Sequence, residues 1–450
     1  MSEKKLTPIH IWALGVGIVL VGEFMGWNFT ILLGGSYASL IGMWVISAMY
    51  GMVVLMTTEM ASVMPESGGQ YTMAKYLLGP LAAFNIGLMM VLEYAMLEAA
   101  DVLVVGELLQ TLNPGIHTVP FVFLTLLALT YINYHGAYMS LTLNFFITAF
   151  AFCCVLSLLL GIDLSSIRGI SVRLKEMTNG LPFGILGMFA ALQFSCWFFL
   201  GIEGTAMAAD ECKNIHRALP VGSVMGLTTL MIGGTVTWFV CSALIPAEVL
   251  QDSVYPLFEA ADASGKPFLL FLLFAGTMMA CLASANGCIN DASRAWNVLS
   301  RDGLLPDVFA KIHPKYKSPY RALLFLIPIS MAFALTGLLD QIVTFSIFSA
   351  LILYLITAIM MIRFRKLYPL GSIKRGFTVP LHPLPAVITI VLVCATLFGM
   401  YLNYWKSMVA ATVFYLISSV WFIMRRSKFV DEDTFYRSAI DTLGFPHLKD

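Results

Sequence analysis

Two glutamates stand between glycines in the middle of long apolar segments of this sequence. One lies in the run Gly22-Glu23-Phe24-Met25-Gly26-Trp27, and the other in Gly201-Ile202-Glu203-Gly204. A carboxylate at the centre of a membrane costs roughly 2.5–3.5 kcal/mol, and a glycine inside a helix costs about 1 kcal/mol. Both runs therefore fit unwound backbone that lines a cavity better than they fit a continuous helix. We predict two interrupted helices whose carboxylates bind a cation.

Further acids lie inside two other apolar segments. Glu93, Glu98 and Asp101 share one of them, and Asp291 lies near the end of the other. By our predicted bounds no lysine or arginine lies well inside any apolar segment, so a proton, a metal cation or a cationic substrate must neutralise these acids. An alternative stays open for Glu98, Asp101 and Asp291, and is favoured for Glu107. In that alternative the side chain faces water near a helix end.

The composition of the chain indicates which elements hold these acids. Of its 450 residues, 59% are hydrophobic and only 12% are charged, and the mean hydropathy is +0.84. Soluble domains carry about 25% charged residues. Apolar runs of about 18 residues or more can cross a membrane as helices, and they recur along the whole sequence. We predict an all-α polytopic membrane protein with twelve transmembrane helices at 11–33, 39–63, 81–111, 119–136, 142–162, 183–209, 220–245, 267–292, 320–338, 341–363, 384–404 and 407–424.

The distribution of lysine and arginine predicts the orientation. With the N-terminus in the cytoplasm, most of the 26 basic residues fall in cytoplasmic segments, as the positive-inside rule requires. The loop between the fifth and sixth helices is the basic exception. A short amphipathic cytoplasmic helix is expected at about 292–300, and a cytoplasmic tail at 425–450. We expect a multi-pass protein of the plasma membrane, the inner membrane in a bacterium, with both termini in the cytoplasm.

Several classes of function are excluded or disfavoured by the sequence. The net charge is zero, which gives no indication of a nucleic-acid partner, and the eight cysteines show no paired metal spacing. We expect no metal, no cofactor and no catalytic cluster, so the protein is not expected to be an enzyme. A channel would need a repeated pore ring and a receptor would need a soluble output domain. Paired interruptions in two halves of a chain instead indicate a transporter.

Four local motifs in sequence order carry a family resemblance. Residues 59–71 are similar to E-x-A-x-x-x-P-x-x-G-G-x-Y, and the sixth helix carries F-x-G-x-E, ending at Glu203. Residues 211–220 are close to E-x-K-x-P-x-R-x-x-P, with Ile215 where proline is usual. The fourth motif is S-R at Arg294, followed by R-D-G-x-x-P and P-x-x-A at 301–306 and 319–322. Together they resemble the amino acid–polyamine–organocation (APC) superfamily of transporters.

This resemblance implies a fold and a mechanism. The fold is LeuT-like, with a 5+5 inverted repeat of helices 1–5 (about 11–162) and helices 6–10 (about 183–363). Helices 11 and 12 (about 384–424) are peripheral. The implied mechanism is secondary transport by alternating access, with substrate bound where helices 1 and 6 are unwound.

Within the superfamily, the first helix points to a substrate class. Amino acid permeases usually read G-S-G where this chain has Gly22-Glu23, and a fixed negative charge there would attract an ammonium group and repel a carboxylate. Together with residues 197–208, this stretch resembles the ethanolamine permease branch. The resemblance implies import of a small cationic amine such as ethanolamine. The alternative is an amino acid permease or exchanger for zwitterionic or cationic amino acids or polyamines.

The expected binding site combines the two interruptions with helices 3 and 8. Aromatic side chains near the interruptions would hold a cation over their faces. The predicted substrate-binding residues are Gly22, Glu23, Phe24, Gly26, Trp27, Glu93, Tyr94, Trp197, Phe198, Gly201, Glu203 and Cys288. Asn286, Asn290 and Asp291 are further candidate lining residues, and Glu98 and Asp101 are expected to form an extracellular funnel.

The coupling mechanism is left open by the sequence. Some proton-coupled relatives carry a lysine in helix 5, where its ammonium replaces a sodium ion, but helix 5 has no lysine here. Glu203 or Glu93 could carry a coupling proton instead, and sodium is the other candidate ion. A facilitator or an exchanger is equally compatible with the sequence. The expected partners are thus a cationic amine, a coupling proton or sodium ion, and membrane lipid.

Overall fold

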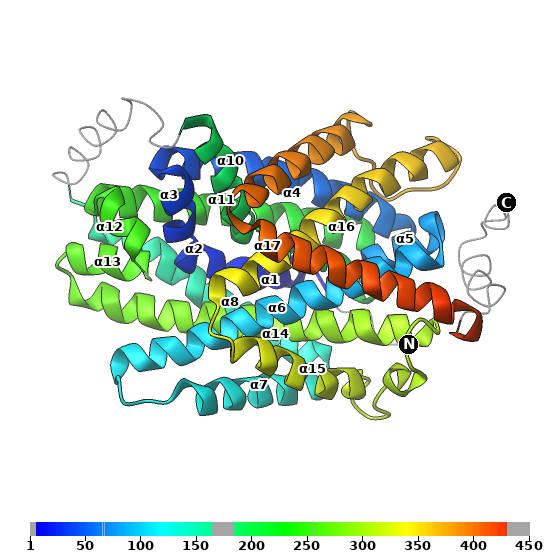
Figure 1. Ribbon diagram of the computed structural model, residues 1–450, viewed down its shortest axis with the longest axis horizontal. Helices are drawn as coiled ribbons and strands as arrows, with labels where there is room; N and C mark the ends of the chain where they lie inside the picture. The colour runs from blue at the N-terminus through cyan, green and yellow to red at the C-terminus, as the bar shows by residue number, and fades with distance from the viewer. Residues whose placement is uncertain (1–5, 65, 67, 164–183, 254, 430–450) are drawn as a thin grey trace.

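The computed structural model describes residues 6–64, 66, 68–163, 184–253 and 255–429 (Figure 1). Over these residues the chain is helical almost throughout and has no named β-strand; an isolated bridge pairs Leu6 with Cys212. The predicted all-α fold is confirmed. The basic loop between helices 5 and 6 and most of the predicted tail lie outside the described residues.

The long helices of the first half match the first five predicted segments, whereas the short helix α5 was not predicted. Prolines begin α1 and α6, where the missing N–H is not needed, and glycines with positive φ separate neighbouring helices at Gly35 and Gly79. The elements are α1 (Pro8–Val19), α2 (Val21–Met25), α3 (Trp27–Gly34), α4 (Ser36–Val63), α5 (Gln70–Leu78), α6 (Pro80–Leu112), α7 (Thr118–Tyr134), α8 (Ala137–Ser157) and the 3-10 helix η1 (Leu158–Gly161).

The second half contains the remaining predicted segments and several short helices that the sequence did not indicate. Those short helices, α12, α13 and η4, lie in loops. The elements are α10 (Gly184–Ser195), η2 (Cys196–Phe198), η3 (Ile202–Glu211), α11 (Ile215–Leu244), α12 (Ala247–Asp252), α13 (Pro256–Ala263), α14 (Pro267–Arg301), η4 (Asp307–Ala310), α15 (Tyr320–Ala334), α16 (Leu339–Leu367) and α17 (Leu384–Phe429).

Eight described helical runs are long and apolar enough to cross a membrane. The other predicted segments differ from these in length or composition. Helix α6 has 33 residues but carries four acids, and α7 and α15 are apolar but have only 17 and 15 residues. Helix α17 contains two predicted segments, because Tyr404 leaves helical geometry (φ −127°, ψ 28°). The described part of the chain thus accounts for the twelve segments of a polytopic membrane protein.

One predicted boundary is wrong, and it matters for the charges. The eighth segment was expected to end at 292 and to be followed by a separate amphipathic helix, but α14 continues unbroken to Arg301. Arg294 therefore lies inside a long helix and is only 9% exposed. Arg294 thus belongs to the same helix as the eighth predicted segment, two residues beyond the expected end of that segment.

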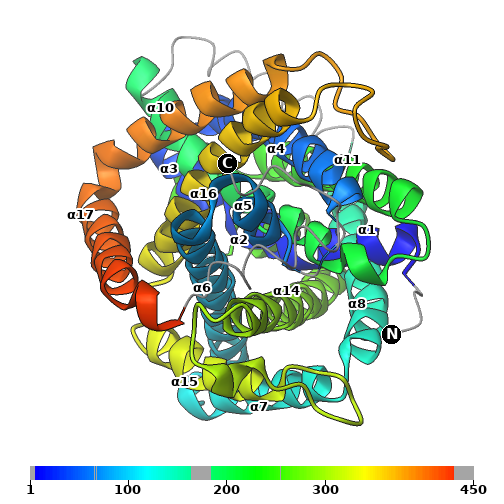
Figure 2. The same ribbon diagram turned by 90° about the vertical axis from the view of Figure 1, so that its right-hand side faces the viewer.

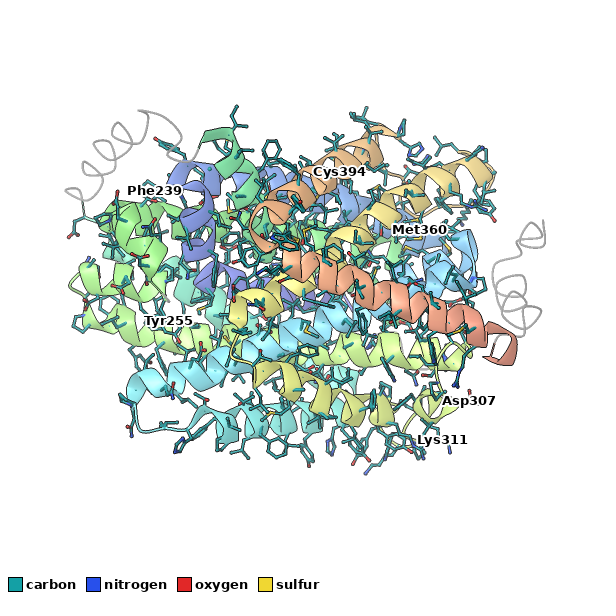
Figure 3. The ribbon with its side chains drawn as sticks, in the orientation of Figure 1. Phe239, Tyr255, Asp307, Lys311, Met360 and Cys394 are labelled. Atoms are coloured by element: carbon teal, nitrogen blue, oxygen red, sulfur yellow. The ribbon has the colours of Figure 1, made fainter. Side chains whose placement is uncertain are left out.

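Helices α6 and α14 pack together in the centre of the bundle. Helices α1, α8 and α16 surround this pair, whereas α17 lies at the periphery (Figure 2). In Figure 3, Asp307 and Lys311 lie at one end of the molecule and Tyr255 at the other. The flanks between these ends carry exposed apolar side chains, as a lipid-facing surface requires. Examples are Trp44, Tyr131, Phe146, Phe271, Val391 and Leu416.

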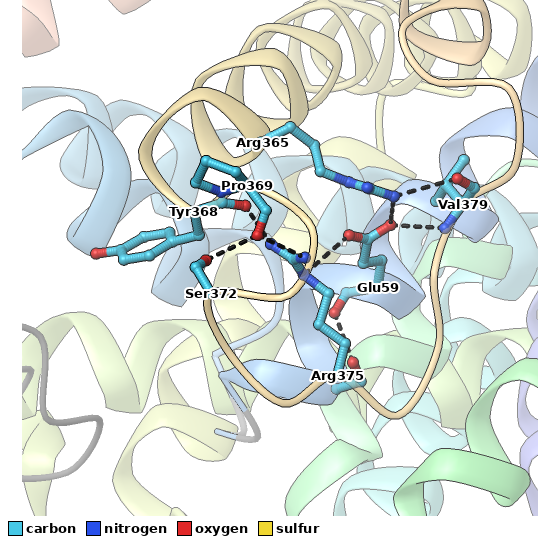
Figure 4. A network of polar contacts seen from close by, with 8 residues as sticks. Glu59, Arg365, Tyr368, Pro369, Ser372, Arg375 and Val379 are labelled. Atoms are coloured by element: carbon cyan, nitrogen blue, oxygen red, sulfur yellow. Dashed lines mark hydrogen bonds and ion pairs between the residues drawn. The ribbon is translucent and has the colours of Figure 1, made fainter.

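A buried ion network ties the end of α4 to the loop after α16 (Figure 4). Glu59 is fully buried, and its Oε2 accepts hydrogen bonds from Arg365 Nη2 (2.8 Å) and from the Val379 N–H (2.6 Å). Its Oε1 lies 3.3 Å from Arg375 Nε. Burial lowers the pKa of the Arg375 guanidinium, and the charge of Glu59 opposes that shift. One carboxylate thus balances two guanidinium groups.

Two more polar contacts close the predicted cytoplasmic side. Asp302, just after α14, accepts hydrogen bonds from Tyr71 Oη (2.7 Å) and Lys75 Nζ (2.9 Å) of α5. Arg294 of α14 pairs with Glu211 at the end of η3 (2.6 Å). These contacts join the segments that precede α6 and α11 to the C-terminal part of α14.

Candidate functional site

The sixth membrane segment is fully interrupted at the predicted glycines. The α-helix stops at Ser195, and 3-10 turns on either side flank Gly201, which has φ +99°. A side chain at position 201 would also collide with Ile18, because a Cβ there would lie 2.5 Å from Ile18 Cγ2. Only glycine fits both the left-handed backbone and the close approach of helix 1.

The first membrane segment is not unwound at Gly22–Met25 as predicted: these residues lie in the short helix α2, and the breaks fall on either side of it, at Leu20 and Gly26. Leu20 separates α1 from α2 and keeps helical angles (φ −57°, ψ −22°). The Glu23 N–H bonds the Leu20 carbonyl at 3.2 Å, a 3-10 turn instead of an α-helical one. The two interruptions therefore differ in kind. Helix 1 only changes from α-helical to 3-10 geometry for one turn, whereas the α-helix of helix 6 ends and its backbone turns left-handed at Gly201.

The two interruptions pack directly on each other. A Cβ at Gly22 would lie 2.4 Å from the Trp197 carbonyl oxygen, so the backbones touch at this point. One turn further, the Phe198 ring packs against Gly26 and lies 4.4 Å, centroid to centroid, from the Trp27 ring. These five residues form one part of the contact between helices 1 and 6, and Ile18 with Gly201 forms another.

Three carboxyl groups from different segments gather beside this contact. Glu93 of α6 and Glu203 of η3 face each other through their side chains. Asp291 of α14 approaches the same place, since a Cβ at Gly204 would lie 2.4 Å from Asp291 Oδ2. All three acids are at most 1% exposed, and no Glu93 or Glu203 carboxylate oxygen has a well-formed hydrogen bond among the described residues. We call Glu93, Glu203 and Asp291 the acidic cluster.

The acidic cluster has little positive charge around it. Arg294, one turn from Asp291 on α14, is the nearest base, but it hydrogen-bonds Glu211 and the Met207 carbonyl. Asp291 instead accepts a hydrogen bond from the Asn290 amide at 2.9 Å. Two carboxyl groups in contact cannot both stay charged without a cation or a proton between them. The pair of Glu93 and Glu203 is therefore suited to bind a positive charge.

Tyrosines line the acidic cluster, and the sequence reasoning missed two of them. Tyr94 was predicted, and its buried hydroxyl has no hydrogen-bond partner among the described residues. Tyr50 of α4 and Tyr354 of α16 were not predicted; their rings meet edge to face at 5.1 Å. The Tyr50 ring also lies 5.7 Å from that of Phe199. A tyrosine in mid-membrane is unusual, because tyrosines prefer the interfaces, and this signal could have identified both.

Other predicted site residues lie away from the acidic cluster. The Glu23 carboxyl group faces α11, with the Thr237 hydroxyl 3.5 Å from Oε2. Phe24 faces α14 near Gly276, and the Trp197 ring packs near Phe29 (6.0 Å between centroids). Cys288 is the exception, because this fully buried side chain of α14 lies near Asp291 and Tyr94 as well as near Asp101. The structure thus brings Glu93, Tyr94, Gly201 and Glu203 together, and separates Glu23 from them.

The two acids of the expected funnel are buried at the bundle interior. Glu98 accepts a hydrogen bond from Ser330 of α15 at 2.9 Å, and Asp101 lies near Ser284 of α14. They are 0% and 1% exposed. The alternative in which these side chains face water is not what the structure shows, and the same holds for Asp291.

Asn286 belongs to an amide chain between helices. Asn133 of α7 donates to Asn286 Oδ1 at 2.8 Å, and Asn286 Nδ2 donates to Asn144 Oδ1 of α8 at 3.1 Å. Asn144 and Thr148 in turn contact Gly17 of α1. Asn286 thus joins three helices, which gives it a structural position.

Replacing Asn286 with leucine is expected to lower the free energy of unfolding by about 1–3 kcal/mol, because the buried side chains of Asn133 and Asn144 each lose a hydrogen bond. Substrate affinity should stay within about twofold if the role is structural. Thermal unfolding of the purified protein in detergent measures the first effect. Asn403→Leu, at an exposed position on α17, is the control. An unchanged melting temperature together with lost binding would contradict this assignment.

No group of three or more histidine, cysteine, aspartate or glutamate side chains that could hold a metal ion is found within the described ranges.

Comparisons with known proteins identify the family. A family model described as "Amino acid permease" matches residues 9–432. An uncharacterised transporter of Rhizobium meliloti is 46% identical and covers 95% of this chain and 93% of its own length. The branched-chain amino acid permease of Bacillus subtilis is 24% identical, covering 84% of this chain and 85% of its own length. A vacuolar cationic amino acid transporter of Arabidopsis thaliana is 25% identical, covering 71% of this chain and 56% of its own length.

Proposed function

The chain belongs to the amino acid permease family, and from this premise we propose that it imports a small cationic amine, such as ethanolamine, by secondary active transport. The site would be the acidic cluster and its tyrosines, next to the contact between helices 1 and 6. The protein would lie in the plasma membrane with both termini in the cytoplasm. Helices 1–5 and 6–10 would form two inverted repeats that alternate access to the site.

The pair of Glu93 and Glu203 is the observation that carries this proposal. Both side chains are buried without a basic partner among the described residues, so an ammonium group would supply the missing positive charge. The hydroxyl oxygens of Tyr94, next to Gly204, and of Tyr354, next to Glu203, could accept hydrogen bonds from the ammonium group. A substrate carboxylate would meet only like charge here, since Arg294 is already paired with Glu211.

An amino acid substrate is the second candidate. Its support is the similarity to relatives described as a branched-chain amino acid permease and a cationic amino acid transporter. A cationic amino acid would place its side-chain ammonium at the acidic cluster and would need a separate group for its carboxylate. The backbone N–H groups exposed where helix 6 breaks could serve, because such groups bind anions.

Alternating access requires the predicted cytoplasmic contacts to separate. The bonds of Tyr71 and Lys75 to Asp302, and the pair of Arg294 with Glu211, join segments on either side of the route from the acidic cluster to the cytoplasm. We expect these contacts to break when the site opens inward.

An uptake and binding panel tests the proposed substrate. Purified protein in proteoliposomes is assayed with ethanolamine, choline, putrescine, methylamine, leucine and arginine. We expect ethanolamine or another amine without a carboxylate to be preferred. Preference for leucine or arginine would favour the second candidate and overturn the first.

Removing both acids of the pair is expected to abolish amine binding. The double variant Glu93→Gln/Glu203→Gln should weaken ethanolamine binding by about 30-fold or more, because a desolvated charge partner is worth at least about 2 kcal/mol. The matched control is Glu248→Gln/Glu259→Gln, which removes the same charge from exposed positions. Equal affinities in the two double variants would exclude the acidic cluster as the amine site.

A further inference from the structure

Glu23 is the one acid of the two interruptions that does not reach the acidic cluster. It is fully buried in α2, and its carboxyl group points at the backbone of α11. The Thr237 hydroxyl, 3.5 Å from Oε2, is the polar side chain against it, and Oε1 has no hydrogen-bond partner among the described residues. A fully ionised carboxylate would be almost without solvation in this place.

The hydrogen bonds of Thr237 indicate how a proton would fit. Its hydroxyl oxygen is 3.0 Å from the Gly234 carbonyl oxygen and 3.5 Å from Glu23 Oε2, so the carbonyl is the better acceptor for its single hydrogen. Its oxygen already accepts a bond from Trp27 Nε1 at 2.8 Å. A hydroxyl oxygen can accept two hydrogen bonds, so one lone pair is left, and a protonated Glu23 3.5 Å away could donate to it while every other bond stays in place.

The space around Glu23 is too small for an amine. A Cβ at Gly234 would lie 2.9 Å from Glu23 Oε2, and one at Gly233 would lie 3.7 Å from Glu23 Cδ. The same two glycines contact Met43 and Phe152, which are apolar. The backbone of α11 is thus directly against the carboxyl group, and a proton is the only cation that needs no further room.

No other ionisable side chain of the described residues contacts this carboxyl group. The elements packed against α2 include α1, α3, α11, α13, α14 and η2, and Met43 of α4 and Phe152 of α8 border the glycines beside Glu23. On α4, Glu59 pairs with Arg365 and Tyr50 packs on Tyr354; on α8, Cys153 is exposed and Cys154 lies against Gly276. On the other elements, Glu259 and Asp262 of α13 are exposed, Cys196 of η2 bonds Leu192, and Cys241 of α11 contacts the Pro256 carbonyl. His10 of α1 bonds Thr7, His216 and Arg217 stand at the opposite end of α11, and Arg294 of α14 pairs with Glu211. On α14, Cys281 and Cys288 lie near Asp101, and Asp291 belongs to the acidic cluster. Arg301 is the last residue of that helix.

We propose that Glu23 is the coupling-proton site of the transporter, separate from the amine site at Glu93 and Glu203. This proposal rests on the proposed amine transport for its physiological role. The carboxylic acid would release its proton to water on one side of the membrane and take one up from the other. No other group is consumed in the cycle.

The position of Glu23 in the chain explains how the proton would act on the substrate site. Its neighbour Gly22 touches the Trp197 carbonyl, and the Trp27 indole bonds Thr237 and packs on Phe198. A charge on Glu23 would have to be hydrated or paired, which requires α2 to move away from α11. Because α2 and the helix 6 interruption are in contact, that movement would also shift the amine site.

Two measurements on proteoliposomes test this proposal with Glu23→Gln, the neutral analogue of the acid. With equal pH on both sides, ethanolamine counterflow should stay within about twofold of the native rate, because the amine site is intact. With an inward proton gradient, the native protein should accumulate ethanolamine and Glu23→Gln should not. Loss of ethanolamine binding in Glu23→Gln would make Glu23 a substrate ligand and overturn the proposal, as would undiminished gradient-driven accumulation. Glu23→Asp, which keeps an ionisable acid, should retain gradient-driven accumulation.

An infrared measurement needs no substrate and separates the two proposals. The difference spectrum between high and low pH should contain a carbonyl band of a protonated buried acid that is lost in Glu23→Gln and displaced in Glu23→Asp. If the native protein transports no amine but shows this band, the proposed function fails and the proton site stands. Native and variant spectra without any difference in the acid region would refute the proton site.

Discussion

Replacing Gly22 with alanine is expected to reduce transport to background. The added Cβ would lie 2.4 Å from the Trp197 carbonyl oxygen, 2.8 Å from its carbon and 3.1 Å from the Phe198 Cα. All three atoms belong to the backbone, so no side chain can rotate to make room. Overpacking of this kind costs about 1–3 kcal/mol or more, and here it would push apart the two interruptions that border the acidic cluster. Initial rates of uptake in proteoliposomes measure the effect.

The matched control for this variant is Gly226→Ala. Gly226 lies on α11, and a Cβ there would meet its nearest atoms, Ile202 Cδ1 and Val16 Cγ2, at 3.6 and 3.7 Å, which is ordinary contact. Gly226→Ala should keep native transport and gain some helix stability. If Gly22→Ala transports as well as Gly226→Ala, the direct contact between helices 1 and 6 is not needed for function.

Replacing Glu59 with glutamine should be the most destabilising charge change in the described part of the molecule. Its carboxylate balances Arg365 and Arg375, whose side chains are 7% and 3% exposed, and it also receives the Val379 N–H. Removing one partner of a buried ion pair costs about 3–5 kcal/mol, because the remaining charges stay buried without compensation. We expect a clear fall of the melting temperature in detergent.

Exposed acids provide the control for Glu59→Gln. Glu248→Gln makes the same chemical change on the surface of α12 and should leave the melting temperature close to native, since exposed charges contribute about 0–1 kcal/mol. A melting temperature for Glu59→Gln equal to that of Glu248→Gln would show that the network in Figure 4 adds no stability.

The apolar runs of the sequence were enough to predict the helices. Segment lengths depend on a local property, namely how many consecutive residues can face lipid, and the predicted bounds agree with the structure to within a few residues for most segments. The exception is α14. Beyond residue 292 this helix becomes polar because it packs inside the bundle, so a criterion based on hydropathy ended it too early.

The interruption of helix 6 was also visible in the sequence, because Gly201 and Gly204 are needed for local reasons. Gly201 has φ +99°, and Gly204 leaves room for Asp291. The sequence could not show that helix 1, unlike helix 6, keeps helical backbone angles at its interruption. Leu20 and Gly26 keep helical angles there, and their conformation depends on what packs against α2.

The carboxyl groups themselves were identified from the sequence, but their grouping was decided by the tertiary structure. A residue's position in a helix gives its depth in the membrane, whereas its direction depends on how that helix is rotated against its neighbours. Glu23 and Glu203 belong to two interruptions that pack on each other, yet one faces Thr237 of α11 and the other faces Glu93. Tyr50 and Tyr354 joined the site from helices far apart in the chain. The sequence by itself determined a membrane transporter with acids in its apolar segments; only the packing of the helices separated Glu23 from the acidic cluster, the two places that we propose for the proton and the amine.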